Sequence, residues 1–373
     1  MGIAEQLQTH GSVDIKDLLL ISGDSHVSEP EDLWQERLPA SLRDKAPAFP
    51  KRRTPGAGHS AGTLNEARPG GTDPNFRVAE MEQDGVSAEV LFPTLALRLF
   101  ALEDAELQEA CFRVYNDWLI DYCSVAKDRL FGIACISMYD IDHAIEEMRR
   151  CRNAGMVGGM VWQVPPESLP FTKAEHYDRF WAAAQDLDMP VDVHILTGFD
   201  YSRNLTGDRG GPLEAHRGSV NYKTLGAMNT VMDLIFTGVL ERNPNLIINV
   251  VESEIGWIPF ALQQWDYYVQ RFGSLKENSP RPLPIKILPS EYFERQMSAT
   301  FFNDPIGGRV LEFWGQDNCM WSTDYPHPNS PWPESRQYIA KNLGHLPTDA
   351  LQKLVRDNVA RFYKIKLPTP VGV

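Results

Sequence analysis

Runs of apolar, β-favouring residues recur along the chain, and segments with helical patterning separate most of them. This alternation predicts parallel strands joined by helical crossovers. Eight strands are the number found in a (β/α)8 TIM barrel, which is the fold class we expect. The predicted strands are Leu20–His26, Ala88–Thr94, Phe131–Ser137, Gly159–Val164, Pro190–Ile195, Leu246–Ser253, Ala299–Asn303 and Cys319–Asp324.

An open, doubly wound sheet is the alternative architecture. That fold usually carries a glycine-rich phosphate loop after its first strand, and the sequence has none there. The barrel would carry long insertions after strand 1, Pro39–Phe76, and after strand 5, Asp200–Asn221. Insertions of this length commonly form lids or interfaces. We expect residues 1–373 to form a single barrel domain, with residues 1–17 as an N-terminal extension.

Composition narrows the range of partners. The 373 residues include 43% hydrophobic residues, and the formal net charge is −14. This charge argues against nucleic acid and against an anionic membrane as partners. No apolar run approaches the length of a membrane helix, about 20 residues, and no signal-peptide pattern opens the chain. The five cysteines form no CxxC pair. We therefore expect a cytoplasmic protein with reduced cysteines.

Potential metal ligands stand at the ends of several predicted strands. Asp24 and His26 are two residues apart, so their side chains share one face of the first strand. His194 lies at the end of the fifth strand, and Asp324 ends the eighth. The active site of a TIM barrel lies where its strands end, so these side chains should converge. A mixture of carboxylates and imidazoles suits a divalent ion such as Zn, Mn or Fe.

Further candidates surround these four. Glu252 and Glu254 follow the sixth strand and would share a face, where like charges require a cation or shifted pKa values. We expect Glu252 to be a fifth metal ligand and a catalytic residue that orients substrate or a second ion. His216, in the insertion after strand 5, is a catalytic candidate. Asp192 is expected to orient His194, and His327 to lie at the rim.

Structural roles remain open for each of these residues. An aspartate at the end of a strand can cap a turn, and a lone histidine in a strand is often a satisfied core residue. A serine nucleophile has no support, because the chain contains no GxSxG motif.

Four segments of the chain resemble the amidohydrolase-2 family. They are ISGDSHVSEPEDLWQERLP, RVAEMEQDGVSAEVLFPT, ESEIGWIPF and WSTDYPHPNSPWPES. The family includes aminocarboxymuconate-semialdehyde decarboxylase and the dihydroxybenzoate and carboxyvanillate decarboxylases, and the resemblance spans about residues 18 to 365. It implies that one metal ion is bound by Asp24, His26, His194 and Asp324.

The chain departs from this family pattern in two places. Asp24 stands where many members have His or Glu. Decarboxylase members also carry a histidine after the sixth strand, where this chain has Glu252-Ser253-Glu254. The resulting excess of carboxylates would suit a second ion, so we expect one or two divalent ions per chain.

We expect a metal-dependent hydrolase or decarboxylase that acts on a small carboxylate-bearing substrate, with an aromatic ring as one option. Asp324 would serve as general base to a metal-activated water. The resemblance also implies two alternatives: an Fe/Mn dinuclear monooxygenase similar to 2-aminoisobutyrate hydroxylase, or a supporting metal-binding subunit of a two-barrel complex. We expect a homo-oligomer or a hetero-oligomer with a related barrel.

Overall fold

The computed structural model describes residues 3, 15–49, 68–199, 221 and 223–367. Most of the predicted N-terminal extension, residues 1–17, lies outside the described residues. The same holds for residues 50–67 of the insertion after strand 1 and for nearly all of the insertion after strand 5. The candidate His216 falls in the latter.

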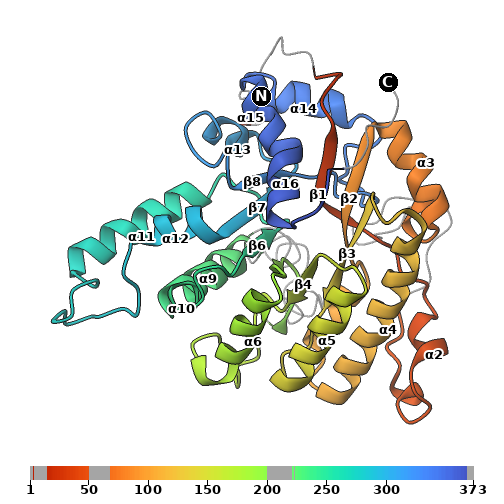
Figure 1. The fold of residues 1–373 in the computed structure, drawn as a ribbon, viewed down its shortest axis with the longest axis horizontal. Coiled ribbons are helices and arrows are strands. Elements are labelled where there is room, and N and C mark those ends of the chain that lie inside the picture. Colours follow the sequence, from red (N-terminus) through yellow and green to blue (C-terminus); the bar gives the residue numbers. More distant parts are fainter. Residues whose placement is uncertain (1–2, 4–14, 50–67, 200–220, 222, 368–373) are drawn as a thin grey trace.

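Eight parallel strands form one sheet in the order β1 to β8, as predicted (Figure 1). Each predicted strand matches an observed one, and every residue of every strand is buried. Burial of both faces is typical of parallel sheets covered by helices. The strands are β1 Leu20–His26, β2 Val86–Phe92, β3 Leu130–Cys135, β4 Gly158–Val161, β5 Val191–His194, β6 Ile248–Val251, β7 Met297–Phe301 and β8 Cys319–Trp321.

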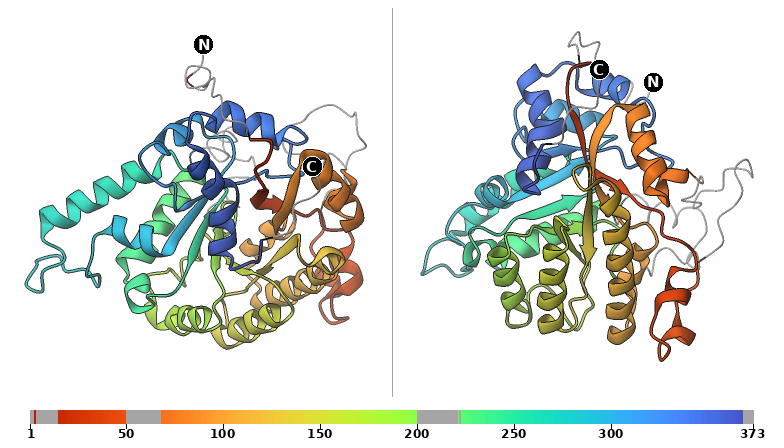
Figure 2. Two further views of the ribbon diagram at one scale, coloured as in Figure 1. Left: turned by 45° about the horizontal axis from the view of Figure 1, so that its top comes forward. Right: turned by 45° about the vertical axis from the view of Figure 1, so that its right-hand side comes forward.

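Helices connect the strands and cover the outside of the sheet (Figures 1 and 2). The α-helices are α2 Leu33–Arg37, α3 Pro74–Asp84, α4 Ala105–Cys123, α5 Ile141–Asn153, α6 Ala174–Asp186, α9 Lys223–Phe236, α10 Val239–Arg242, α11 Ile258–Phe272, α12 Pro289–Gln296, α13 Pro305–Val310, α14 Ser335–Leu343, α15 Thr348–Gln352 and α16 Asn358–Phe362. Shorter 3-10 turns are η1 Arg43–Lys45, η2 Pro69–Gly71, η3 Ala96–Ala101 and η4 Ser124–Ala126, and a π-helical turn, η6 Lys353–Asp357, joins α15 to α16.

Contacts between β1 and the segment after β8 bring the first and last strands together. The amide of Asp324 donates to the carbonyl of Asp24 at 3.0 Å, and the amide of His26 donates to the carbonyl of Tyr325 at 2.6 Å. The hydroxyls of Ser25 and Thr323 are hydrogen-bonded at 2.8 Å. The backbones that carry Asp24, His26 and Asp324 are therefore fixed relative to one another, although 300 residues separate their two segments in the chain.

Two predicted boundaries were wrong in ways that matter for the site. The sixth and eighth strands were predicted to include Glu252 and Asp324, but β6 ends at Val251 and β8 at Trp321. Both acidic residues instead adopt left-handed backbone conformations, with φ of 56° at Glu252 and 52° at Asp324.

The sequence analysis did not predict two helices, α11 and α12; α11 extends away from the barrel, whereas α12 packs beside β7 (Figures 1 and 2). The second of these begins at Pro289, which follows a proline-rich stretch of the sequence. All five cysteines are free, as expected, and four of them are buried. No helix among the described residues is long and apolar enough to cross a membrane.

Candidate metal centre

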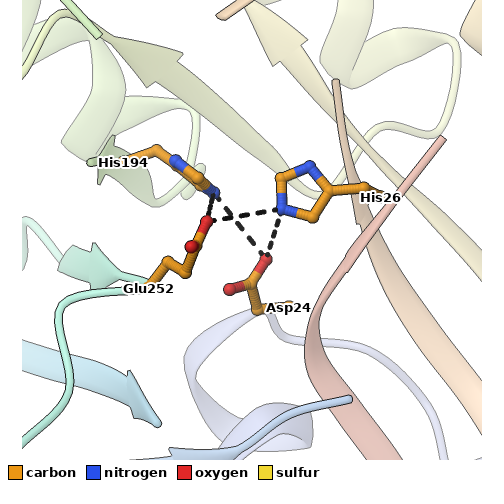
Figure 3. A group of neighbouring side chains, drawn as sticks. All are labelled: Asp24, His26, His194 and Glu252. Atoms are coloured by element: carbon orange, nitrogen blue, oxygen red, sulfur yellow. Dashed lines mark ion pairs between the residues drawn. The ribbon is translucent and has the colours of Figure 1, made fainter. Parts of the chain in front are cut away.

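Four buried side chains meet where β1, β5 and β6 end (Figure 3). Nε2 of His26 lies 3.4 Å from Oδ1 of Asp24 and 3.8 Å from Oε2 of Glu252. Nε2 of His194 lies 3.5 Å from the same Glu252 oxygen and 3.9 Å from Oδ1 of Asp24. One ligand atom from each residue lies within 4.8 Å of the others, so a single cation between them could contact all four.

A second group shares two of these residues. His26 and Glu252 also converge with Asp324 and His327, which follow β8. Oδ1 of Asp324 lies 3.5 Å from Nε2 of His26 and 2.6 Å from Nδ1 of His327. We call the six residues Asp24, His26, His194, Glu252, Asp324 and His327 the cage.

Hydrogen bonds fix the orientation of two imidazole rings. Nδ1 of His26 lies 2.7 Å from the carbonyl oxygen of Pro93, and Nδ1 of His194 lies 2.7 Å from that of Ile195. A carbonyl oxygen can only accept, so Nδ1 carries the hydrogen in both rings. In the neutral rings the Nε2 lone pairs therefore point into the cage, which is the arrangement typical of metal-binding histidines.

Several atoms that line the cage have no hydrogen-bond partner among the described residues. Both carboxylate oxygens of Asp24, Nε2 of His26 and of His194, and Oδ2 of Asp324 are buried and unpaired. Leaving a buried polar atom unpaired costs about 1–3 kcal/mol, more when it is charged. Lone pairs of two imidazoles and several carboxylates that face one point fit a divalent cation, which would satisfy all of them.

Burial and the charges of neighbouring groups shift the pKa values of the cage residues in different directions. Burial, followed by the charges of Glu252 and Asp324, raises the pKa of Asp24 well above its ordinary value. Burial lowers the pKa of His26 well below its ordinary value and that of His194 to about 4. Both rings are therefore neutral near pH 7, with lone pairs available. Burial disfavours ionisation of Glu252, yet Lys223 and His194 bring its pKa below the usual value.

The sequence matches the model of the amidohydrolase family over residues 24–365, which is nearly the whole chain. The chain belongs to the amidohydrolase family. This match confirms the expected family, and the matched region contains every residue of the cage.

Known relatives of this amidohydrolase include decarboxylases. A gamma-resorcylate decarboxylase from Rhizobium sp. (strain MTP-10005) is 24% identical over 262 residues, which cover 68% of this chain and 76% of the relative. The 5-carboxyvanillate decarboxylase of Novosphingobium aromaticivorans, solved with manganese and 4-hydroxy-3-methoxy-5-nitrobenzoic acid, superposes with a TM-score of 0.70 at 20% identity and covers 94% of this chain and 98% of that one. An amidohydrolase from Mycobacterium avium subsp. paratuberculosis superposes with a TM-score of 0.73 at 17% identity, covering 93% and 99% of the two chains. These superpositions show that the fold is an amidohydrolase barrel.

All five predicted metal ligands of this amidohydrolase, Asp24, His26, His194, Glu252 and Asp324, lie in the cage. The structure thus brings together residues that the sequence analysis selected from the ends of four different strands. Their metal-binding role stays a prediction, and the catalytic candidate His216 lies outside the described residues.

The predicted pairing of Glu252 with Glu254 was wrong. Left-handed φ angles of 56° and 55° at the two residues replace the extended backbone that would place them on one face. Glu252 points into the cage, while the carboxylate of Glu254 accepts from the amides of Phe302 and Asn303, each at 3.3 Å. Burial and the nearby charge of Asp304 raise the pKa of Glu254 to about 8. Glu254 therefore caps the end of β7 and is not among the ligands that converge in the cage.

The predicted contact between Asp192 and His194 was also wrong. Oδ1 of Asp192 accepts from Nδ2 of Asn249 at 3.0 Å and from the hydroxyl of Tyr363 at 2.8 Å. The carbonyl of Ile195 takes the place that was predicted for Asp192 at the His194 ring. Burial raises the pKa of Asp192 to about 7, so this carboxyl belongs to a polar network inside the barrel.

His327 was predicted to lie at the rim, but it is buried in the cage. Its amide donates to the carbonyl of Asp324 at 2.9 Å, so a tight turn folds the ring back onto that residue. Burial lowers the pKa of His327, but the charges of Asp324 and Glu252 outweigh this effect and raise it overall. The sequence shows His327 three residues after a predicted ligand, but it does not show the turn that brings the ring into the cage.

One aromatic side chain borders the cage. The ring centroid of Phe92, at the end of β2, lies 5.3 Å from that of His194 and 6.2 Å from that of His26. Trp162, which directly follows β4, is buried against Tyr139, with ring centroids 5.2 Å apart.

Proposed function

We propose that this amidohydrolase is a metal-dependent decarboxylase of a small aromatic carboxylate. The observation that carries the proposal is the set of buried, unpaired ligand atoms of Asp24, His26, His194 and Asp324 that face the interior of the cage. The nature of the substrate is inferred from the relatives named above, which act on gamma-resorcylate and 5-carboxyvanillate.

Asp24, His26, His194 and Asp324 would hold the ion, with Glu252 as an additional ligand. When bound, a divalent ion supplies a Lewis acid that polarises the substrate and lowers the pKa of a bound water. Manganese is our first choice, because the carboxylates make the site hard and the 5-carboxyvanillate decarboxylase structure holds that ion.

Loss of carbon dioxide leaves an electron pair on the ring carbon, which must receive a proton. His327 is our candidate proton donor: its Nδ1 is hydrogen-bonded to Asp324, its Nε2 lies 3.2 Å from the hydroxyl of Thr94, and its ring lies beside that of His26, with centroids 4.0 Å apart. The family resemblance implies a catalytic histidine after the sixth strand in decarboxylases, a position that Glu252 occupies here. We infer that His327, from the loop after β8, takes over that function.

The proposal is tested with protein stripped of metal and reconstituted with MnCl2. We expect the reconstituted protein to consume 2,6-dihydroxybenzoate or 5-carboxyvanillate, as measured by chromatography. One molecule of carbon dioxide should be released for each substrate molecule consumed. Activity should disappear after EDTA treatment and in the Asp24→Asn variant. A fully reconstituted wild-type protein that leaves a panel of hydroxylated benzoates unchanged would refute it. Release of an amine or alcohol from other carboxylates would instead identify a hydrolase.

A second candidate function is an oxygenase with a dinuclear centre. It is favoured by the two overlapping ligand groups, which share His26 and Glu252. The first group adds Asp24 and His194, and the second adds Asp324 and His327. Elemental analysis after reconstitution separates the two functions. Two ions per chain that include iron, together with substrate-dependent consumption of dioxygen, would favour the oxygenase, and one manganese ion without oxygen uptake would exclude it.

A further inference from the structure

Among the described residues, the side chains of the cage differ in exposure, and Glu252 and His327 are the most exposed at 7% each. The side chains of Asp24, His26 and His194 are completely buried, while that of Glu252 is 7% exposed. Next to Glu252 lies Lys223, whose side chain is 26% exposed. Exposure thus increases from the ligands through Glu252 to Lys223, and a substrate that approaches from solvent would meet Lys223 before it meets the ligands.

Charge makes the position of Lys223 significant. Three carboxylates, those of Asp24, Glu252 and Asp324, line the cage, and the whole chain has a net charge of −14. An anionic substrate would be repelled unless a cation received it. Among the described residues, Lys223 is the one Lys or Arg side chain within ion-pair distance of the cage.

The geometry leaves Lys223 free to bind a further anion. Its Nζ lies 3.5 Å from Oε1 of Glu252, whereas close charge-assisted pairs have separations of about 2.7–2.9 Å. The other Glu252 oxygen, Oε2, faces His26 and His194. An ammonium group has three donors, so the contact with Glu252 leaves donors directed to other acceptors. Lys223 is also the first residue of α9, directly after the insertion that follows β5.

We propose that Lys223 is the specificity-determining residue that receives the carboxylate of the substrate and directs it to the cage. This inference rests on the proposed function, because it takes the substrate to be an aromatic carboxylate. A role limited to neutralising Glu252 is the alternative. The two roles predict different binding when the Lys223 charge is removed. If Lys223 receives the carboxylate, only a ligand with a carboxylate should bind more weakly, and the same ring without a carboxylate should bind as before.

The test compares wild-type protein, Lys223→Met and Lys223→Arg, each loaded with Mn²⁺, by isothermal titration calorimetry. The two probes are 2,6-dihydroxybenzoate and resorcinol, which has the same ring and hydroxyl groups but no carboxylate. Lys276→Met is the matched control, because Lys276 is an exposed lysine in the segment that joins α11 to α12, which Figure 1 shows extending away from the barrel.

We expect Lys223→Met to weaken binding of 2,6-dihydroxybenzoate by about 10- to 100-fold, with resorcinol binding unchanged. Lys223→Arg should recover most of the loss, and Lys276→Met should behave as wild type. Mn²⁺ affinity of Lys223→Met should be equal to that of wild type or higher, because a positive charge beside Glu252 has been removed.

Three results would overturn the inference. Unchanged binding of 2,6-dihydroxybenzoate by Lys223→Met would show that the carboxylate is held elsewhere while leaving the proposed function intact. An equal loss for both probes, or a loss of Mn²⁺ affinity, would show that Lys223 positions Glu252 and does not select the carboxylate. A wild-type protein that binds no hydroxylated benzoate at all would refute the proposed function itself, and with it this inference.

Discussion

Replacement of Asp24 by Asn should stabilise the metal-free protein and remove most of the stabilisation that metal gives the wild type. In the metal-free protein the ligand oxygens of Asp24 and Glu252 lie within 4.8 Å of each other. At an effective dielectric constant of about 20, two like charges at that distance repel by about 3.5 kcal/mol. Protonation of Asp24 and the charge of Lys223 relieve part of this repulsion. We therefore expect Asp24→Asn to stabilise the metal-free protein by about 1–3 kcal/mol at pH 8.

The sign of its pH dependence follows from the raised pKa of Asp24. The folded protein holds a proton on Asp24 at pH values where the unfolded chain has lost it, so metal-free wild-type stability falls as the pH rises above about 4. Asn does not titrate, and the advantage of the variant should therefore grow with pH above this value. At pH 3 the two proteins should unfold at nearly the same temperature.

With metal bound, most or all of this advantage should be lost. An ion at 100 times its Kd stabilises the wild type by about 2.7 kcal/mol, and a hundredfold loss of affinity in the variant would leave about 0.4 kcal/mol of that. For 373 residues, 1 kcal/mol corresponds to about 1.3 °C in Tm. Thermal unfolding followed by circular dichroism should therefore place Asp24→Asn about 1–4 °C above wild type in EDTA, and remove nearly all of the gain that MnCl2 gives the wild type.

Asp84→Asn serves as the control, because this buried carboxylate outside the cage accepts from the amide and hydroxyl of Ser335. It should lower Tm equally with and without MnCl2. If Asp24→Asn destabilised the protein by the same amount in both conditions, Asp24 would be a structural residue and the metal-centre hypothesis would fail.

Three further outcomes are expected. Asp192→Asn should stabilise the metal-free protein by an amount that grows from pH 4 to pH 7 and reaches about 4 kcal/mol. The reason is that the pKa of Asp192 is raised to about 7, so in this range the folded protein keeps a proton that the unfolded chain loses. A difference in urea denaturation that stays constant across this range would contradict this. Arg77→Met should cost about 3–5 kcal/mol in urea denaturation, since it leaves Glu89, paired at 2.5 Å inside the protein, without its partner. His327→Gln should lower kcat by about 10²–10⁴-fold with one Mn²⁺ still bound; a fall from two bound ions to one would assign His327 to a second metal site.

The barrel was predictable because each of its strands is a short apolar run that ends in a turn. Helices α11 and α12 were not, for separate reasons. The outer side of α11 carries exposed aromatic residues, Phe260, Tyr267 and Tyr268. These residues weaken the contrast between a polar and an apolar face that identifies a helix. In α12, Pro289 occupies the first turn, where proline is well tolerated, although in sequence it reads as a loop residue.

The residues of the candidate site also differ in whether their positions could be predicted from the sequence. Asp24, His26 and His194 could be selected because they lie within strands, where alternation and the strand-end rule apply. Glu254 and His327 could not be placed, because both follow left-handed residues beyond the ends of strands. A single left-handed residue changes the direction of every side chain after it, and the sequence shows no glycine that would signal such a turn.

The left-handed residues themselves indicate that the cage exists for function. Glu252 and Asp324 each adopt a backbone conformation that costs a residue with a side chain about 1–2 kcal/mol. The backbone holds them there, because the amide of Glu252 donates to Oγ1 of Thr300 at 2.7 Å and that of Asp324 to the carbonyl of Asp24 at 3.0 Å. Strain, like-charge repulsion and unpaired buried atoms thus coincide in one small volume of an otherwise regular barrel. One divalent cation would offset the last two of these costs directly and give the strained geometry its use.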